Sequence, residues 1–494
     1  MKKHVLYFVR GGIFAVILFL ALSGINRMAV PKYLNSDFPT SSNFLGFYEM
    51  EENSIDVLFL GSSHTMSAFS PQEIYDQFGL RSYNLGSQEQ SPFLSYYWLR
   101  EALRFQKPKA VVLDTYLCYD FSEEPLNSSE VTVRRALDHM RWSSVKVEAI
   151  ADICAQDEDQ SVSSYYFPNV RYHNRWLNDM KEVDFLLSEW GAFYQMKGYA
   201  LVTRYPGNME FEPFEAGSVA RKTWMLPLMR EYMDKIVALC RENQIELLLV
   251  KTPTTAGTVQ KFNAMSDYAK QNQLQYLDFN EKSLYEEIGY DFQTDNREWS
   301  HVNHWGAVKL CRKLGEVLVK EYHVPAVRDQ QWEDSRPFYL DMVQNAKMQY
   351  IDRVNIYLAA LQEDRYTIFL AVRGDAAEAY NRNIENGMER LGLQTSLSGK
   401  TDWSYYAVIS AGGVREELSK EALNANGSFR DGLGVYEISS AGTDSGDSCS
   451  ILLDGTEYAR NRRGLNIVVY DNSCKKVIDS VCFDLHDKEL TANR

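Results

Sequence analysis

Short apolar runs separated by helical patterns constrain the fold of residues 50–326 more than any other feature of this chain. Strands are predicted at 55–60, 82–85, 110–113, 246–250 and 274–278, and helices at 71–78, 95–105, 224–243, 261–272 and 305–322. Continuous apolar strands that alternate with helices are typical of a parallel sheet covered on both faces. The sequence therefore predicts an α/β domain of three layers, with functional loops at the carboxyl ends of its strands.

The interval 120–222 interrupts this alternation. It is rich in aromatic side chains, among them Tyr165, Trp176, Trp190 and Tyr199. A loop region of this size inside an α/β domain is usually either a lid or a small helical subdomain. The aromatic residues are therefore interpreted as packing within such an insertion, with contact to carbohydrate as the functional alternative.

A charged, proline-flanked segment at 328–337 predicts a boundary, and a second α/β domain is expected over 337–494. Its predicted elements are a long helical segment at 339–362, a helix at 376–391, and strands at 366–372, 404–409, 434–439, 450–453, 464–470 and 476–483. The only histidine of this domain, His486, follows the last strand and has no partner apparent in the sequence.

The first 30 residues predict a membrane anchor. Basic Lys2, Lys3 and Arg10 accompany an apolar stretch of about 20 residues, which is long enough to cross a bilayer. By the positive-inside rule the N-terminus is then cytoplasmic, and everything after about Val30 lies outside. A cleaved signal peptide is the alternative, because Ala21-Leu22-Ser23 resembles a small-x-small cleavage site. Both interpretations place the globular part outside the cytoplasmic membrane.

Composition argues against several classes of protein. The formal net charge of −15 is unsuited to nucleic-acid binding, which needs basic residues to neutralise phosphates. The 8 histidines and 7 cysteines show no Cys-x-x-Cys pair or other metal-ligand spacing. We therefore expect no metal, no cofactor and no disulfide framework.

Two short segments far apart in the chain carry the candidate chemistry. In the first, an apolar strand stops at Gly61-Ser62-Ser63 and delivers a serine onto a sharp turn at the sheet edge. In the second, Glu298 precedes His301 by three residues, so that one loop presents both side chains. A serine hydroxyl becomes a good nucleophile when an imidazole takes its proton and an acid fixes the tautomer of that imidazole. Ser63, His301 and Glu298 are therefore the predicted catalytic triad.

These segments resemble the first and last sequence blocks of the SGNH (GDSL-type) hydrolase superfamily, where Gly-Asp-Ser carries the nucleophile and Asp-x-x-His the acid and base. Ser62 stands at the aspartate of the first block, and Glu298 at that of the last. The resemblance is closest to the membrane-anchored DltD-like branch, where Gly-Ser-Ser is the usual form, and it covers about 54–322. It implies a flavodoxin-like three-layer fold and serine-dependent acyl-ester chemistry.

The resemblance also suggests how the site stabilises an oxyanion, which requires preorganised hydrogen-bond donors. The superfamily pattern assigns two of them to the backbone N–H groups of Ser63 and Gly86. The third is an asparagine in a Gly-x-Asn block, but this chain has Asp114-Thr115-Tyr116 at the corresponding strand end. Thr115, Tyr116 and His64, which is adjacent to the nucleophile, are therefore candidate substrate-binding residues.

Two residues remain as alternatives within the triad. Glutamate is one methylene longer than the aspartate of the family pattern, so Asp295 is an alternative acid. His304 is an alternative base, although it stands where the family pattern is variable.

Parts of the second domain resemble the interleukin-like EMT inducer domain. The matching pieces are 369–377, 463–470 and 477–484. In that family the piece similar to 463–484 comes first, so this chain resembles a circular permutation of it. The resemblance implies a compact lectin-like or binding module.

Together these features predict an extracytoplasmic serine acyltransferase or acyl-esterase. The resemblance implies O-acyl groups of a cell-surface polysaccharide or teichoic-acid-like polymer as substrate, and a multispanning membrane O-acyltransferase as partner. Transfer and hydrolysis would use identical residues. The alternative is a non-enzymatic, membrane-anchored scaffold with a degenerate hydrolase fold, which the missing asparagine block favours and the retained Ser63 and His301 oppose.

Overall fold

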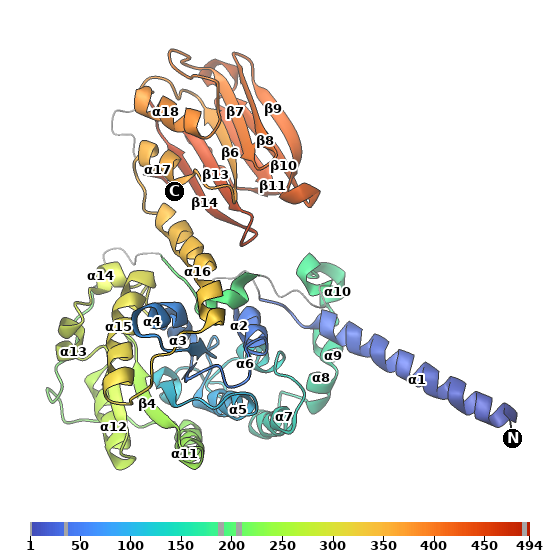
Figure 1. Cartoon of the computed structure of the whole chain (residues 1–494), viewed down its shortest axis with the longest axis vertical. Helices are drawn as coiled ribbons and strands as arrows, with labels where there is room; N and C mark the ends of the chain where they lie inside the picture. Colours follow the sequence, from blue (N-terminus) through green and yellow to red (C-terminus); the bar gives the residue numbers. More distant parts are fainter. Residues whose placement is uncertain (1, 34–37, 186–191, 204–209, 487–491) are drawn as a thin grey trace. The chain divides into compact units, whose positions relative to one another are not determined.

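The computed structural model describes residues 2–33, 38–185, 192–203, 210–486 and 492–494, and the chain divides into two compact units, 1–339 and 340–494 (Figure 1). Each unit has its own sheet and is described by itself. Trp190, one of the aromatic residues singled out in the sequence, lies outside the described residues.

The described strands of the first unit form one parallel sheet in the order β2-β1-β3-β4-β5. They are β1 (Val57–Leu60), β2 (Ser82–Asn84), β3 (Ala110–Asp114), β4 (Glu246–Lys251) and β5 (Gln275–Asp278). This order is that of the flavodoxin-like doubly wound fold, whose ligands bind outside the carboxyl ends of the strands. The predicted α/β fold with a parallel sheet is therefore confirmed.

Helices cover both faces of this sheet. One layer contains α5 (Pro92–Ala102), α11 (Pro227–Glu242) and α12 (Val259–Gln271), and the other contains α3 (Ser63–Ala68), α4 (Pro71–Phe78) and α15 (His304–Lys320). Leu58 and Leu60 pack into the core of the first layer. Phe59, which points to the opposite face, stacks on Phe69 at the end of α3. Buried residues on both faces explain why β1, β3 and β4 are mainly apolar.

The described part of the interval 120–222 contains helices joined by irregular segments. The helices are α6 (Glu130–Leu137), α7 (Ser144–Gln156), α8 (Val162–Tyr166), α9 (Pro168–Tyr172), α10 (Arg175–Asn178), η2 (Glu182–Phe185) and η3 (Ala192–Met196), and η1 (Tyr116–Cys118) precedes the interval. Tyr165 and Tyr199 are buried here, whereas Trp176 is exposed. Only part of the aromatic content is therefore explained by packing.

The remaining helices of the first unit are α2 (Thr40–Phe47), α13 (Lys282–Glu287) and α14 (Phe292–Asp295), together with the N-terminal α1 (Lys2–Ala29). Residues 7–29 of α1 are long and apolar enough to cross a membrane, with a mean hydropathy of 2.2. A signal sequence shares these properties. The N-terminus is thus consistent with membrane anchoring.

The second unit carries a mostly antiparallel sheet. Its described strands are β6 (Tyr366–Arg373), β7 (Ser404–Ser410), β8 (Gly413–Ser419), β9 (Leu423–Phe429), β10 (Gly434–Ala441), β11 (Ser448–Leu453), β12 (Thr456–Glu457), β13 (Gly464–Asp471), β14 (Lys476–Phe483) and β15 (Ala492–Asn493). Their order is β12-β11-β10-β6-β13-β14-β15, with β7 on β6, β8 on β7 and β9 on β10. Separate apolar cores lie on its two faces, one of them with α17 (Val354–Ala360) and α18 (Arg382–Arg390).

The second unit begins at Leu340, three residues after the start expected at 337, but no irregular linker precedes it, because α16 (Gln330–Met348) runs through most of 328–337 with Pro337 inside. Two other features of this region differ from what the sequence predicts. The helical segment expected over 339–362 is two helices, since residues 349–353 separate α16 from α17. His486 does have a partner, because its Nδ1 lies 2.9 Å from Asp375 Oδ2.

Candidate active site

The turn after β1 holds Ser63 at the beginning of α3. Gly61 has a φ of +143°, and a Cβ added there would lie 2.5 Å from Asp114 Cβ, so glycine is required. Ser62 caps α3 by accepting a hydrogen bond from the His64 backbone N–H at 3.3 Å. Its hydroxyl donates to Asp114 Oδ2 at 2.7 Å. The turn is therefore fixed from both sides, and Ser63 is presented at the carboxyl edge of the sheet.

The structure brings the three predicted triad residues together. Ser63 Oγ lies 2.7 Å from His301 Nε2, and His301 Nδ1 is in hydrogen-bond contact with Glu298 Oε1. All three side chains are partly exposed, as an attacking group and its base must be. With the Nδ1 proton held by Glu298, Nε2 is left to accept the proton of Ser63. These contacts have the arrangement expected of a nucleophile, a base and an orienting acid.

The loop that carries Glu298 and His301 is held at both ends. Asn303 caps α15, accepting from the backbone N–H groups of Trp305 at 3.0 Å and Gly306 at 3.2 Å. Its Nδ2 donates back to the carbonyl oxygens of Thr294 at 2.7 Å and Asn296 at 3.1 Å. This fixed geometry lets the longer side chain of Glu298 reach the histidine that follows it.

Neighbouring groups keep Glu298 ionised. Partial burial acts to raise the pKa of this carboxyl, but hydrogen bonding to His301, the His301 charge and the Arg297 guanidinium outweigh it, so the pKa lies below its ordinary value. Arg297 Nε is 3.2 Å from Oε2, and the Ser300 hydroxyl donates to Oε1 at 3.2 Å. Glu298 is thus suited to stabilise an imidazolium.

His64 lies behind the triad histidine. Its ring stacks on Tyr116 at 3.8 Å and on His301 at 4.9 Å between centroids, and its Nδ1 is 3.0 Å from Thr252 Oγ1. The side chain is buried, and burial, with the charges of His301 and Lys251, lowers its pKa well below the ordinary value of 6.5. His64 is therefore a neutral wall of the site, and Tyr116 is the half-buried aromatic beside it.

Buried charges lie at the carboxyl ends of β3, β4 and β5. They are Asp114, Lys251 and Asp278, all at most 3% exposed. Burial raises the pKa of both carboxyls and lowers that of Lys251, while their mutual attraction acts in the opposite direction. Within the described part of the chain, Lys251 Nζ has no hydrogen-bond acceptor. Asp114 is structural in this setting, since it also accepts from the Tyr116 backbone N–H at 3.0 Å.

The candidate oxyanion donors differ in availability. Among the described residues, the backbone N–H of Ser63 has no acceptor. That of Gly86 donates to Asn84 Oδ1 at 3.1 Å, and Thr115 uses its hydroxyl to bond the Val250 carbonyl oxygen at 3.1 Å. The structure therefore leaves Ser63 free as a donor, engages Gly86, and directs Thr115 away from the nucleophile. Tyr116 remains as a substrate-facing candidate.

The alternative acid and base are engaged elsewhere. Asp295 is buried and accepts from Lys309 Nζ at 2.6 Å and from the Asp291 backbone N–H at 2.8 Å. His304 is also buried, with Nδ1 3.2 Å from the Tyr199 hydroxyl. Ser63 instead contacts His301, and His301 contacts Glu298.

Sequence reasoning missed Phe38 and Ser300. The Phe38 ring lies 5.1 Å from the His301 ring, tilted by 48°, and covers one side of it. Ser300 Oγ is 2.9 Å from His301 Nδ1. Ser300 stands beside the motif and could have been noted, whereas no local pattern connects Phe38 with a loop so distant in sequence. Among the described residues, no group of three or more His, Cys, Asp or Glu side chains could hold a metal ion.

Comparison with known proteins gives little further guidance. No family model matches the chain, and no curated protein matches its sequence. A solved structure from Bacteroides fragilis, described as a putative acylhydrolase, is similar with a TM-score of 0.27 and 10% sequence identity. That similarity covers 57% of this chain and 95% of the other chain. A likeness this weak carries no functional argument.

Proposed function

We propose that the protein is a serine acyltransferase or acyl-esterase that acts outside the cytoplasmic membrane on O-acyl groups of a cell-surface polysaccharide or teichoic-acid-like polymer. The observation that carries the proposal is the contact chain from Ser63 Oγ through His301 to Glu298. Its place at the carboxyl edge of a parallel sheet is where such folds bind ligands. The apolar α1 supports the location.

In the proposed reaction, Ser63 Oγ attacks the acyl carbonyl carbon while His301 Nε2 takes its proton. Glu298 stabilises the resulting imidazolium, and the Ser63 backbone N–H donates to the oxyanion. The carbon–oxygen bond to the leaving alcohol then breaks, and His301 returns the proton to that alcohol. A second hydroxyl, from water or from a sugar, repeats the sequence and releases the acyl group from Ser63.

The test is turnover of p-nitrophenyl acetate by the purified full-length protein in detergent, with and without a glycan acceptor. Wild type should release p-nitrophenol, and Ser63→Ala and His301→Ala should fall to the background rate with little change in melting temperature. Acetylated acceptor would indicate transfer, and free acetate alone would indicate hydrolysis. Wild-type turnover in Ser63→Ala would refute the assignment. A folded but inactive wild-type protein that still binds glycan would favour the non-enzymatic scaffold.

A further inference from the structure

The end of the apolar helix α1 is attached to the helical interval 120–222. Arg175 of α10 donates from Nη1 to the Ala29 carbonyl oxygen at 2.6 Å. The Asn169 backbone N–H of α9 donates to Asn26 Oδ1 at 3.2 Å. Figure 1 accordingly shows α8, α9 and α10 gathered around the C-terminal end of α1. These helices are thus held where α1 would leave a membrane.

The length of α1 sets the depth of these residues. The 23 residues from Tyr7 to Ala29 rise about 34 Å as a helix, slightly more than the roughly 30 Å hydrocarbon core of a bilayer. Residues directly after Ala29 would then lie at the level of the lipid headgroups. This placement requires that α1 is retained as the membrane anchor.

Short helices at that level expose large apolar side chains. Phe167, Val170, Trp176 and Leu177 are 54%, 55%, 39% and 77% exposed, and no described residue of α9 is buried. Aromatic and apolar side chains in such numbers are typical of the membrane–water interface. Contact with the membrane interface would account for exposed aromatic residues that packing does not explain.

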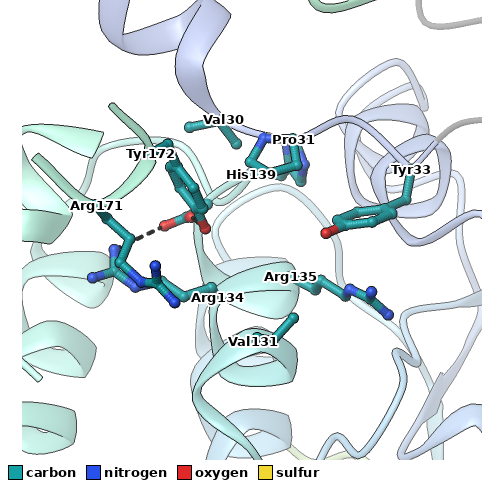
Figure 2. A pocket seen from close by; sticks show the side chains of 10 residues that line it. Val30, Pro31, Tyr33, Val131, Arg134, Arg135, His139, Arg171 and Tyr172 are labelled. Carbon is teal, nitrogen blue, oxygen red and sulfur yellow. Dashed lines mark hydrogen bonds and ion pairs between the residues drawn. The ribbon is translucent and has the colours of Figure 1, made fainter. Parts of the chain in front are cut away.

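A basic pocket opens beside this surface. It is lined by Pro31 and Tyr33 after α1, by Arg134 and Arg135 of α6, and by Arg171 and Tyr172 of α9. Figure 2 shows Arg134 and Arg171 on one side of the pocket and Arg135 below Tyr33 on the other. The Arg135 guanidinium carbon is 4.1 Å from the centre of the Tyr33 ring.

The protein does not fully neutralise or satisfy these arginines. Two carboxylates oppose the three guanidinium groups: Glu130 accepts from Arg171 at 2.8 and 3.0 Å and lies 3.9 Å from Arg134 Nε, and Asp138 lies 3.5 Å from Arg134. Arg134 also donates to the Ser164 carbonyl oxygen at 3.1 Å, and Arg135 donates to Gln88 Oε1. Within the described residues, the buried Nε atoms of Arg134 and Arg135 have no hydrogen-bond acceptor. Arg134 as a whole is only 2% exposed. An anion in the pocket would supply the missing negative charge and, for Arg135, a missing acceptor.

We propose that this pocket binds the phosphate of an anionic phospholipid in the leaflet from which α1 emerges. Arg135 and Arg171 contact the phosphate, Arg134 supports them from behind, and the exposed aromatic residues of α8 to α10 lie among the neighbouring headgroups. Lipid binding of this kind fixes the height of the first unit above the membrane. It is independent of the chemistry proposed for Ser63.

The test is lipid retention by the full-length protein in a non-ionic detergent, measured by native mass spectrometry. Phosphatidylglycerol and phosphatidylcholine of equal chain length are the probes. Wild type should retain phosphatidylglycerol preferentially, and Arg135→Gln/Arg171→Gln should lose about fivefold in retention for each arginine removed. Val131→Glu, which places a carboxylate on the pocket wall without removing a contact, should weaken retention as well. Arg312→Gln, an exposed arginine of α15, is the matched control and should behave as wild type.

Equal retention of the two lipids by wild type, or unchanged preference in both pocket variants, would overturn the proposal. Competition by inorganic phosphate at equimolar concentration would also overturn it, because the site would then recognise free phosphate without the lipid. If the double variant does not fold, lipid retention by Val131→Glu alone decides whether the pocket binds the lipid.

Discussion

At the scale of single residues, the candidate chemistry depends on which acid holds His301. Glu298 contacts the imidazole, while Asp295 is engaged by Lys309. We therefore expect the two carboxyls to have separable roles, Glu298 in the orientation of His301 and Asp295 in the stability of the loop. Replacing each carboxylate by its amide, which changes one oxygen to nitrogen, distinguishes the two roles.

Glu298→Gln should keep the shape of the loop but lose control of the His301 tautomer. We expect turnover of a small ester to fall by roughly 10² to 10⁴ with little change in melting temperature. Asp295→Asn is the matched control, and should destabilise the fold by about 2 kcal/mol while retaining turnover. Steady-state kinetics and thermal melting of both variants check this, and a greater loss of turnover in Asp295→Asn would exchange the roles.

His64 gives a pH-dependent prediction for stability. Its pKa is lowered in the folded state, so the unfolded chain binds a proton below about pH 6.5 that the folded protein does not. Above that pH, His64 therefore does not reduce the free energy of unfolding. Below it, the free energy of unfolding decreases as the pH falls, with a slope approaching about 1.4 kcal/mol per pH unit. The stability of His64→Gln should vary less between pH 7.5 and 5.5 in chemical denaturation. Parallel curves for the two proteins would contradict the neutral, buried assignment.

At the scale of elements, the turn between β1 and α3 is the one on which the site depends. Gly61→Ala should lower the free energy of unfolding by about 2–4 kcal/mol and reduce turnover, because the new Cβ meets Asp114 and displaces Ser63. Gly289→Ala is the control, since its φ of +61° is also left-handed but no atom lies within 4 Å. It should lose only about 1 kcal/mol and keep its turnover. Equal losses of stability and turnover in the two variants would show that backbone strain, and not the contact with Asp114, causes the effect.

The sequence predicted the buried elements well and the exposed ones poorly. Apolar runs mark β1 and β3, and the interval 71–78 is helical as predicted, with Pro71 in its first turn. The strand β8 was missed because it is polar and largely exposed, so no apolar pattern marks it. Pro337 predicts a break, but α16 continues through it, and Trp332 and Tyr339 on either side of the proline are buried in the fold.

The same distinction holds for the candidate site. Ser63, Glu298 and His301 were found because their spacing is local to two short motifs. The hydrogen bond from the Gly86 N–H to Asn84 and the packing of Phe38 on His301 depend on the three-dimensional fold. No sequence motif predicts them.

At the scale of the whole molecule, the division between the units affects how the chain can be shortened. Trp332 is fully buried in the first unit, and the Tyr339 hydroxyl donates to Glu73 at 2.7 Å. A chain ending at Asp329 should therefore lose about 3–5 kcal/mol for the missing tryptophan alone. A chain ending at Met348 should fold and turn over small esters at nearly the full-length rate. Thermal melting and p-nitrophenyl acetate kinetics check both, and equal stability of the two would contradict this boundary.

The second unit is expected to position the polymer rather than to react with it. The chain ending at Met348 should then lose activity on acylated polymer while keeping activity on the small ester, because remote binding energy aligns the reacting group. Equal polymer activity with and without residues 349–494 would remove this role.

The most direct test of the central claim, that Ser63 is the activated nucleophile, is peptide mapping of a fluorophosphonate adduct on the full-length protein. We predict one phosphonylated peptide containing Ser63 in wild type, a much slower adduct in Glu298→Gln, and none in Ser63→Ala or His301→Ala. An adduct on another serine, or no adduct on a folded wild-type protein, would contradict the account.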